Sequence, residues 1–191
     1  MRILPVTCIV ALLFATVTSS VSADDKVKSK EVEAKDITLT VPENWKPGTG
    51  SRLRLATLMV PAVDGDKEGG ELAVYFFGGG GGGVNANLER WEGQFSSKGR
   101  VSKVTEGKSK QGPYYIIDLS GIYNKPIGPP IQGKTAPTPG YKMLGVVLMV
   151  KDKGNYFLKL TGPKKTIEGV AETFRASFGG NAKSEKAYEI K

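Results

Sequence analysis

The sequence predicts an α+β fold: a single-domain α/β/α sandwich whose mostly antiparallel sheet of about six or seven strands is flanked by helices. Short segments of alternating apolar and polar residues recur along the chain, and mostly short connections join them, which favours antiparallel pairing. The segment from Met143 to Val150 is apolar on both alternating faces, so a strand here needs cover on both sides. Two stretches with an apolar stripe at helical spacing can supply that cover.

The first 23 residues have the layout of a cleaved signal peptide. Arg2 precedes an almost unbroken apolar run from Ile3 to Val17, and Val21-Ser22-Ala23 forms a small-x-small cleavage site. The apolar run is shorter than the roughly 20 residues that a spanning helix needs. We therefore expect an exported protein, periplasmic or extracellular, that does not span the membrane after signal cleavage.

The mature chain is expected to open with a disordered leader and then to form one domain. Residues 24–35 are charged and nearly free of large apolar groups, which predicts disorder. The first strand is predicted at Ile37–Val41, where strict alternation ends at Pro42. Further strands are predicted by the same patterns at 52–60, 71–77, 101–106, 114–120, 143–150 and 156–160.

Two helices are predicted, one after the run of six glycines at 78–83 and one near the end of the chain. The first covers 84–95, with Asn85 as its N-cap because its side chain can accept from a free backbone N–H. The second begins at Pro163, a favourable first helical residue, and ends at Gly179-Gly180. Residues 181–191 are expected to form a charged tail, so the domain is predicted to span 36–180.

A proline-rich segment between Tyr123 and Tyr141 is predicted to be a long irregular loop, because proline cannot donate a hydrogen bond to a strand ladder. Long loops in compact domains are often functional, so this segment is a candidate partner-binding loop or else a tolerated insertion. Its candidate residues are Pro126, Pro129, Pro130, Pro137 and Pro139.

The chain lacks most residues that enzymes use for catalysis. It has no histidine, and its single cysteine, Cys8, lies in the predicted signal peptide. This excludes a Ser-His-Asp triad and a thiol nucleophile, and it disfavours a zinc site. We expect no catalytic residue, no cofactor and no metal, and so a non-enzymatic binding or assembly module. A carboxylate-based glycan hydrolase is the alternative, with Asp118 as its candidate acid; a structural ion pair with Arg or Lys is the favoured interpretation of this residue.

The glycine run lies between a strand and a helix, the setting of a phosphate-binding loop. No Gly-Lys-Ser/Thr follows it, so a P-loop is excluded. The run is interpreted as a flexible connector, with an anion at the helix N-terminus as the alternative.

Five basic residues between the first helix and the following hairpin form a candidate polyanion-binding cluster. The formal net charge of +8 would favour envelope glycans or anionic lipids, although a solvated face explains the same charges. Aromatic residues do not interleave with these bases, so no nucleic-acid partner is expected. The expected partner is therefore an unknown envelope protein or polyanion. The cluster consists of Lys98, Arg100, Lys103, Lys108 and Lys110.

Several short motifs resemble PsbP-like domains and uncharacterised exported bacterial proteins of that kind. They are the opening strand with proline and tryptophan at 37–45, the passage Tyr75-Phe76-Phe77, the segment 87–91, and the closing helix after 156–160. The resemblance covers roughly residues 36–178 and implies an α/β/α sandwich with a non-enzymatic accessory or binding role. The six-glycine run and the lack of histidine depart from the family pattern, so no binding residue carries over.

Overall fold

The computed structural model describes residues 28–128 and 132–191. The predicted signal peptide and cleavage site, the leader up to residue 27, and Pro129 and Pro130 lie outside the described residues. Within the described part of the chain, no helix has the length and apolar character needed to cross a membrane.

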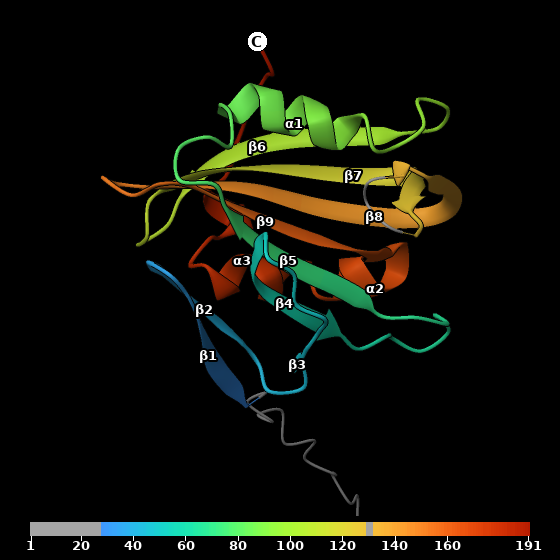
Figure 1. Ribbon diagram of the computed structural model, residues 1–191, viewed down its shortest axis with the longest axis horizontal. Helices are drawn as coiled ribbons and strands as arrows, with labels where there is room; N and C mark the ends of the chain where they lie inside the picture. Colours follow the sequence, from blue (N-terminus) through green and yellow to red (C-terminus); the bar gives the residue numbers. More distant parts are fainter. Residues whose placement is uncertain (1–27, 129–131) are drawn as a thin grey trace, which may run out of the picture.

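A mostly antiparallel α+β fold is confirmed, but the sheet is larger than predicted. It has eight strands in the order β10-β6-β7-β8-β9-β5-β4-β3, and every neighbouring pair is antiparallel. A separate two-stranded sheet of β1 and β2 lies beside it (Figure 1). The prediction of six or seven strands missed the short edge strands and the first strand of the hairpin. The strands are β1 (Ser29–Ala34), β2 (Ile37–Pro42), β3 (Lys46–Pro47), β4 (Arg54–Val60), β5 (Gly70–Phe76), β6 (Val101–Lys108), β7 (Pro113–Pro126), β8 (Thr135–Val150), β9 (Gly154–Pro163) and β10 (Lys186–Ala187).

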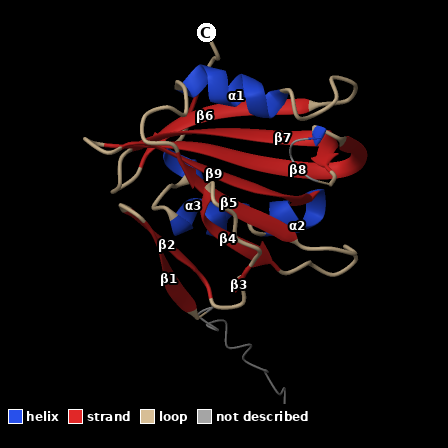
Figure 2. Cartoon of the chain, viewed as in Figure 1, coloured by secondary structure: helices blue, strands red, loops and turns tan. Residues whose placement is uncertain are grey.

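Both faces of the eight-stranded sheet are apolar and covered. Because successive side chains of a strand point to opposite faces, β8 places Leu144 and Val146 in one core and Met143 and Val147 in the other. The first core packs against α2 (Lys164–Gly169), α3 (Ala171–Ser177) and the β1–β2 hairpin, and the second against α1 (Val84–Glu92) (Figures 1 and 2).

The helix predictions need two corrections. The single C-terminal helix predicted from Pro163 is two short helices, because the backbone leaves helical geometry at Val170, where φ is −112°. The N-cap of α1 is Gly83 rather than Asn85, and it makes no side-chain cap hydrogen bond.

The predicted disordered leader is wrong for its second half, which forms strand β1. Ser29–Ala34 pairs in register with β2, and Ala34 is only 1% exposed. Val32 and Ala34 point toward the core, whereas Glu31 and Glu33 point to solvent. The alternation of this strand is hard to recognise in the sequence, because only Val32 and Ala34 are apolar and the residues around them are charged or polar.

The predicted proline-rich loop is instead the far end of the β7–β8 hairpin. Asn124 pairs with Pro137, and Pro126 pairs with Thr135. This end extends beyond both β6 and β9, whose pairing stops at Ser120 and Tyr141 respectively. Beyond Asn124, which donates to the Gln94 carbonyl, β7 has β8 as its neighbour, and this end of β8 has only β7, so prolines without an N–H are tolerated there.

The predicted charged tail is packed against the domain. Its strand β10 pairs with β6, and its Glu185 carboxylate accepts hydrogen bonds from Arg175, Tyr114 and Thr105 at 2.9, 3.1 and 2.7 Å. The tail then crosses to α1, where the Tyr188 hydroxyl donates to Asn85 (2.7 Å), and the chain ends beside that helix (Figure 1).

Candidate functional site

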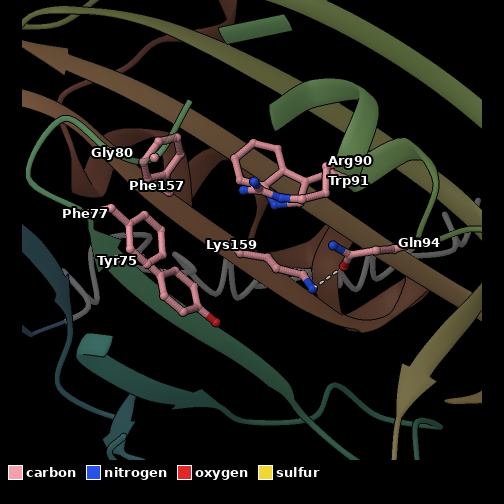
Figure 3. Close-up of a pocket in the computed structure, with 9 residues that line it drawn as sticks. Tyr75, Phe77, Gly80, Arg90, Trp91, Gln94, Phe157 and Lys159 are labelled. Atoms are coloured by element: carbon pink, nitrogen blue, oxygen red, sulfur yellow. Dashed lines mark hydrogen bonds between the residues drawn. The ribbon is translucent and has the colours of Figure 1, made fainter. Parts of the chain in front are cut away.

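Helix α1 covers only part of its face of the sheet, and a pocket of about 400 Å³ lies beside it. We call it the α1 pocket. Strands β5 and β9 contribute one side of it, α1 the other, and the glycine run closes one end (Figure 3). Its lining residues are Tyr75, Phe77, Gly80, Gly81, Arg90, Trp91, Gln94, Phe157 and Lys159.

A second pocket of about 420 Å³, here called the hairpin pocket, adjoins the first and shares Tyr75 and Lys159 with it. It lies between β4, β5 and the extended end of the β7–β8 hairpin. The two shared residues therefore stand between one cavity that is mainly aromatic and one that is rich in charged groups. The charged residues of the hairpin pocket besides Lys159 are Arg54, Glu68, Glu71 and Lys125.

Lys159 is the central charged group of the site. Its ammonium group donates to Gln94 Oε1 at 2.5 Å and to the Tyr123 hydroxyl at 2.9 Å (Figure 3 shows the first of these). Both partners are neutral, and among the described residues no carboxylate lies within 4.0 Å of it. Lys159 is therefore a partly buried cation without a bound counter-charge.

Burial lowers the pKa of Lys159 to about 8. The Glu71 carboxylate opposes this shift, while repulsion from Arg54 and Arg90 adds to it. Burial also raises the pKa of Tyr123 to about 12, so this hydroxyl keeps its proton at neutral pH. The pair thus combines an amine that titrates near physiological pH with a neutral hydroxyl that can donate or accept a hydrogen bond.

Asn87 holds the other cation of the α1 pocket and the glycine run in place. The Asn87 side chain is fully buried, and its amide donates to the carbonyls of Gly81 and Gly83, each at 2.8 Å. Its oxygen accepts from the Arg90 guanidinium at the pocket mouth. A single side chain therefore fixes both a wall of the pocket and the orientation of Arg90.

Part of the glycine run, Gly80 and Gly81, forms a wall of the pocket. A Cβ on Gly81 would lie 2.6 Å from Cε2 of Phe157, so only glycine permits this close approach. The neighbouring Gly82 has a φ of +80°, which also favours glycine.

The carboxylates of the hairpin pocket are paired. Glu71 contacts Arg54 at 2.9 Å, and Glu68 contacts Lys125 at 3.0 Å and accepts from the Tyr141 hydroxyl. The hydrogen bonds from Tyr141 and Lys125 lower the pKa of Glu68. A glycosidase acid needs a raised pKa, so this pocket does not favour hydrolysis.

Asp118, the candidate hydrolytic acid, lies on the opposite face of the sheet from both pockets, where it contacts Lys142 at 2.5 Å. Asp118 therefore forms a structural ion pair with a lysine, which was the interpretation set against a catalytic acid. Within the described ranges, no group of three or more potential metal-binding side chains occurs.

The structure does not bring the candidate polyanion cluster together into one patch. Lys98 and Arg100 precede β6 and Lys110 follows it, so they lie near opposite ends of an eight-residue strand. Lys103 and Lys108 are an odd number of positions apart on β6, so they project from opposite faces of the sheet. Arg100 is engaged by Glu92 at 3.6 Å and by two backbone carbonyls.

The described candidate prolines lie apart from the charged residues of the site, with one exception. Pro126 lines the hairpin pocket, whereas Pro137 and Pro139 are exposed on β8.

Sequence reasoning missed Lys159, Arg90 and Asn87. A usable signal for Lys159 was present: it is the lone charge in the apolar segment 156–160 and shares a face with Phe157. Its hydrogen-bond partners are 65 and 36 residues away in sequence, so only the strand order reveals the site.

No protein-family model and no curated protein matches the sequence. Among solved structures, the fold is similar to the solution structure of cyanobacterial PsbP (CyanoP) from Synechocystis sp. PCC 6803. The TM-score is 0.46 and the identity 12%, over 90% of this chain and 99% of that chain. This is a likeness of fold to a PsbP-family protein, the family that the sequence motifs also resemble.

Replacing Lys159 by Met should stabilise the protein by about 1–2 kcal/mol at pH 7. A pKa lowered from 10.5 to about 8 corresponds to a penalty of about 3 kcal/mol for the charged amine, from which the two lost hydrogen bonds subtract. As pH rises from 8 toward 10.5, the folded state loses this proton before the unfolded state does, so wild-type stability rises. Urea unfolding at pH 7 and 9.5 should show the advantage of the variant shrinking. An advantage that is absent at pH 7 would contradict the burial of this charge.

Proposed function

We propose that this protein is an exported, non-enzymatic binding module whose α1 pocket takes a small organic anion with an apolar body. The observation that carries the proposal is the charge of the pocket. Its described lining contains two cations, Arg90 and Lys159, and no carboxylate. The N-terminal sequence supports export.

The chemistry of the lining supports both parts of the ligand. Tyr75, Phe77 and Phe157 offer aromatic surface for an apolar or planar group. An anionic group that replaced the neutral partners of Lys159 would supply the counter-charge that this amine lacks, and in a partly dehydrated pocket such a pair is stronger than at the surface.

Titration calorimetry with phenylacetate and its neutral isostere phenylacetamide tests the proposal. We expect phenylacetate to bind at least tenfold more tightly, a difference of about 1.4 kcal/mol. Its affinity should fall as the pH rises through about 8, because Lys159 then loses its charge. Raising the salt concentration should weaken binding at the exposed Arg90.

Matched variants localise the effect. Lys159→Met and Arg90→Gln should each weaken phenylacetate binding about tenfold or more, whereas Lys151→Met removes the same kind of charge from an exposed turn and should leave binding unchanged. Equal affinity for the acid and the amide, or equal losses in all three variants, would reject the proposal.

A further inference from the structure

We propose that the α1 pocket holds its ligand through a reversible imine to Lys159, so that its ligands are small organic acids carrying an aldehyde or ketone group, such as aromatic 2-oxo acids. This inference rests on the proposed function and names the ligand class of the same pocket.

The position of Lys159 fits it for a nucleophilic role. Its amine lies on the wall shared by both pockets and is held by two neutral oxygens, so no carboxylate stabilises its protonated form by direct contact. The pKa of about 8 leaves about a quarter of the amine uncharged at pH 7.5, against about 0.1% for an ordinary lysine. Lysines desolvated in apolar pockets beside other cations are the kind that form imines with carbonyl substrates.

The reaction is balanced without any further reactant. The uncharged amine attacks the carbonyl carbon, so that a C–N bond forms while the π bond of the C=O group breaks and its electron pair passes to the oxygen. The oxygen then gains a proton as the nitrogen loses one. The hydroxyl of this carbinolamine then takes up a proton and leaves as water, while the nitrogen lone pair forms the C=N bond. The product is a protonated imine, so the positive charge that attracts an anionic ligand is retained.

Two other side chains fit this chemistry. Tyr123 keeps its proton, and its hydroxyl lies 2.9 Å from the Lys159 nitrogen, where it can donate to the carbonyl oxygen and to the departing hydroxyl. Arg90, oriented by Asn87 at the mouth of the same pocket, supplies a cation for the acid group. Gln94 fixes the amine through its side-chain oxygen.

Reductive trapping tests the inference with the full mature protein. The protein is incubated at pH 7.5 with phenylpyruvate and cyanoborohydride, which reduces an imine to a stable secondary amine, and the modified lysines are mapped by peptide mass spectrometry. We expect Lys159 to be labelled at least tenfold faster than the exposed Lys151, which serves as an internal control in the same molecule. Labelling of Lys159 no faster than of Lys151 would overturn the inference.

Phenyllactate, which has a hydroxyl in place of the ketone, separates this inference from the proposed function. If phenyllactate binds in the pocket but phenylpyruvate is not trapped at Lys159, the imine is wrong and the anion site stands. If neither ligand binds, both are wrong. Lys159→Arg keeps the charge but cannot form an imine, so it should abolish trapping. Tyr123→Phe should slow trapping about tenfold at saturating phenylpyruvate, where a change in affinity no longer affects the rate. A Tyr123→Phe protein that is trapped at the wild-type rate would remove the hydroxyl from the mechanism.

Discussion

Replacing Glu185 by Ala should lower the free energy of unfolding by about 3–5 kcal/mol, although the residue lies only six positions from the last residue, Lys191. Its carboxylate is 4% exposed and contacts the Arg175 guanidinium, which is 10% exposed, at 2.9 Å. Removing Glu185 leaves the buried Arg175 with only a long contact to the exposed Glu172, at 4.0 Å, as its counter-charge. The hydroxyls of Tyr114 and Thr105 lose their acceptor at the same time.

Chemical denaturation of Glu185→Ala beside Glu189→Ala checks this prediction. Glu189 lies in the same tail but is exposed, so its replacement should change stability by less than about 0.5 kcal/mol. Adding Arg175→Met to Glu185→Ala should recover part of the loss, because the poorly compensated buried charge is then absent. Equal, small effects of the two glutamate variants would mean that the tail is loosely attached, as its composition indicates.

The elements that sequence reasoning placed correctly are those whose apolar residues follow a clear period. The strand Ile37–Pro42 and the central part of β8 are predicted because alternation, or apolarity on both faces, directly reports burial. Helix α1 is predicted because Leu88 and Trp91 lie on one helical stripe and are buried.

The elements that were mispredicted are stabilised by contacts between distant residues. Strand β1 is held mainly by pairing with β2, and Glu185 is buried by an ion pair that composition cannot reveal. The prolines of the hairpin are tolerated because β6 and β9 end early, which requires knowledge of the strand order. The site is unpredictable for the same reason: Lys159 meets Tyr123 and Gln94 only because β9, β7 and the turn after α1 lie on one face of the fold.

Gly145 of β8 packs against Trp91, a lining residue of the α1 pocket, and its replacement is expected to have the second large effect on stability. It pairs with Ile117 on one side and with Lys159 on the other, and a Cβ at this position would lie 2.5 Å from Cε3 of Trp91. The missing side chain therefore provides the space in which the indole packs beside Lys159. Gly145→Val should cost about 3 kcal/mol or more, because the strand cannot move away from two hydrogen-bonded neighbours and the buried indole must shift.

A double-mutant cycle distinguishes this packing from a general intolerance of β8 to larger residues. Gly145→Ala and Trp91→Leu should each destabilise by about 2–3 kcal/mol, the first by overpacking and the second by leaving a cavity. Combined, they should cost at least about 1 kcal/mol less than the sum, because the added methyl enters space that the indole has left. Since Trp91 also lines the α1 pocket, both single variants should weaken phenylacetate binding. Additive stabilities would mean that Gly145 and Trp91 are not in contact and that this wall of the pocket is built differently.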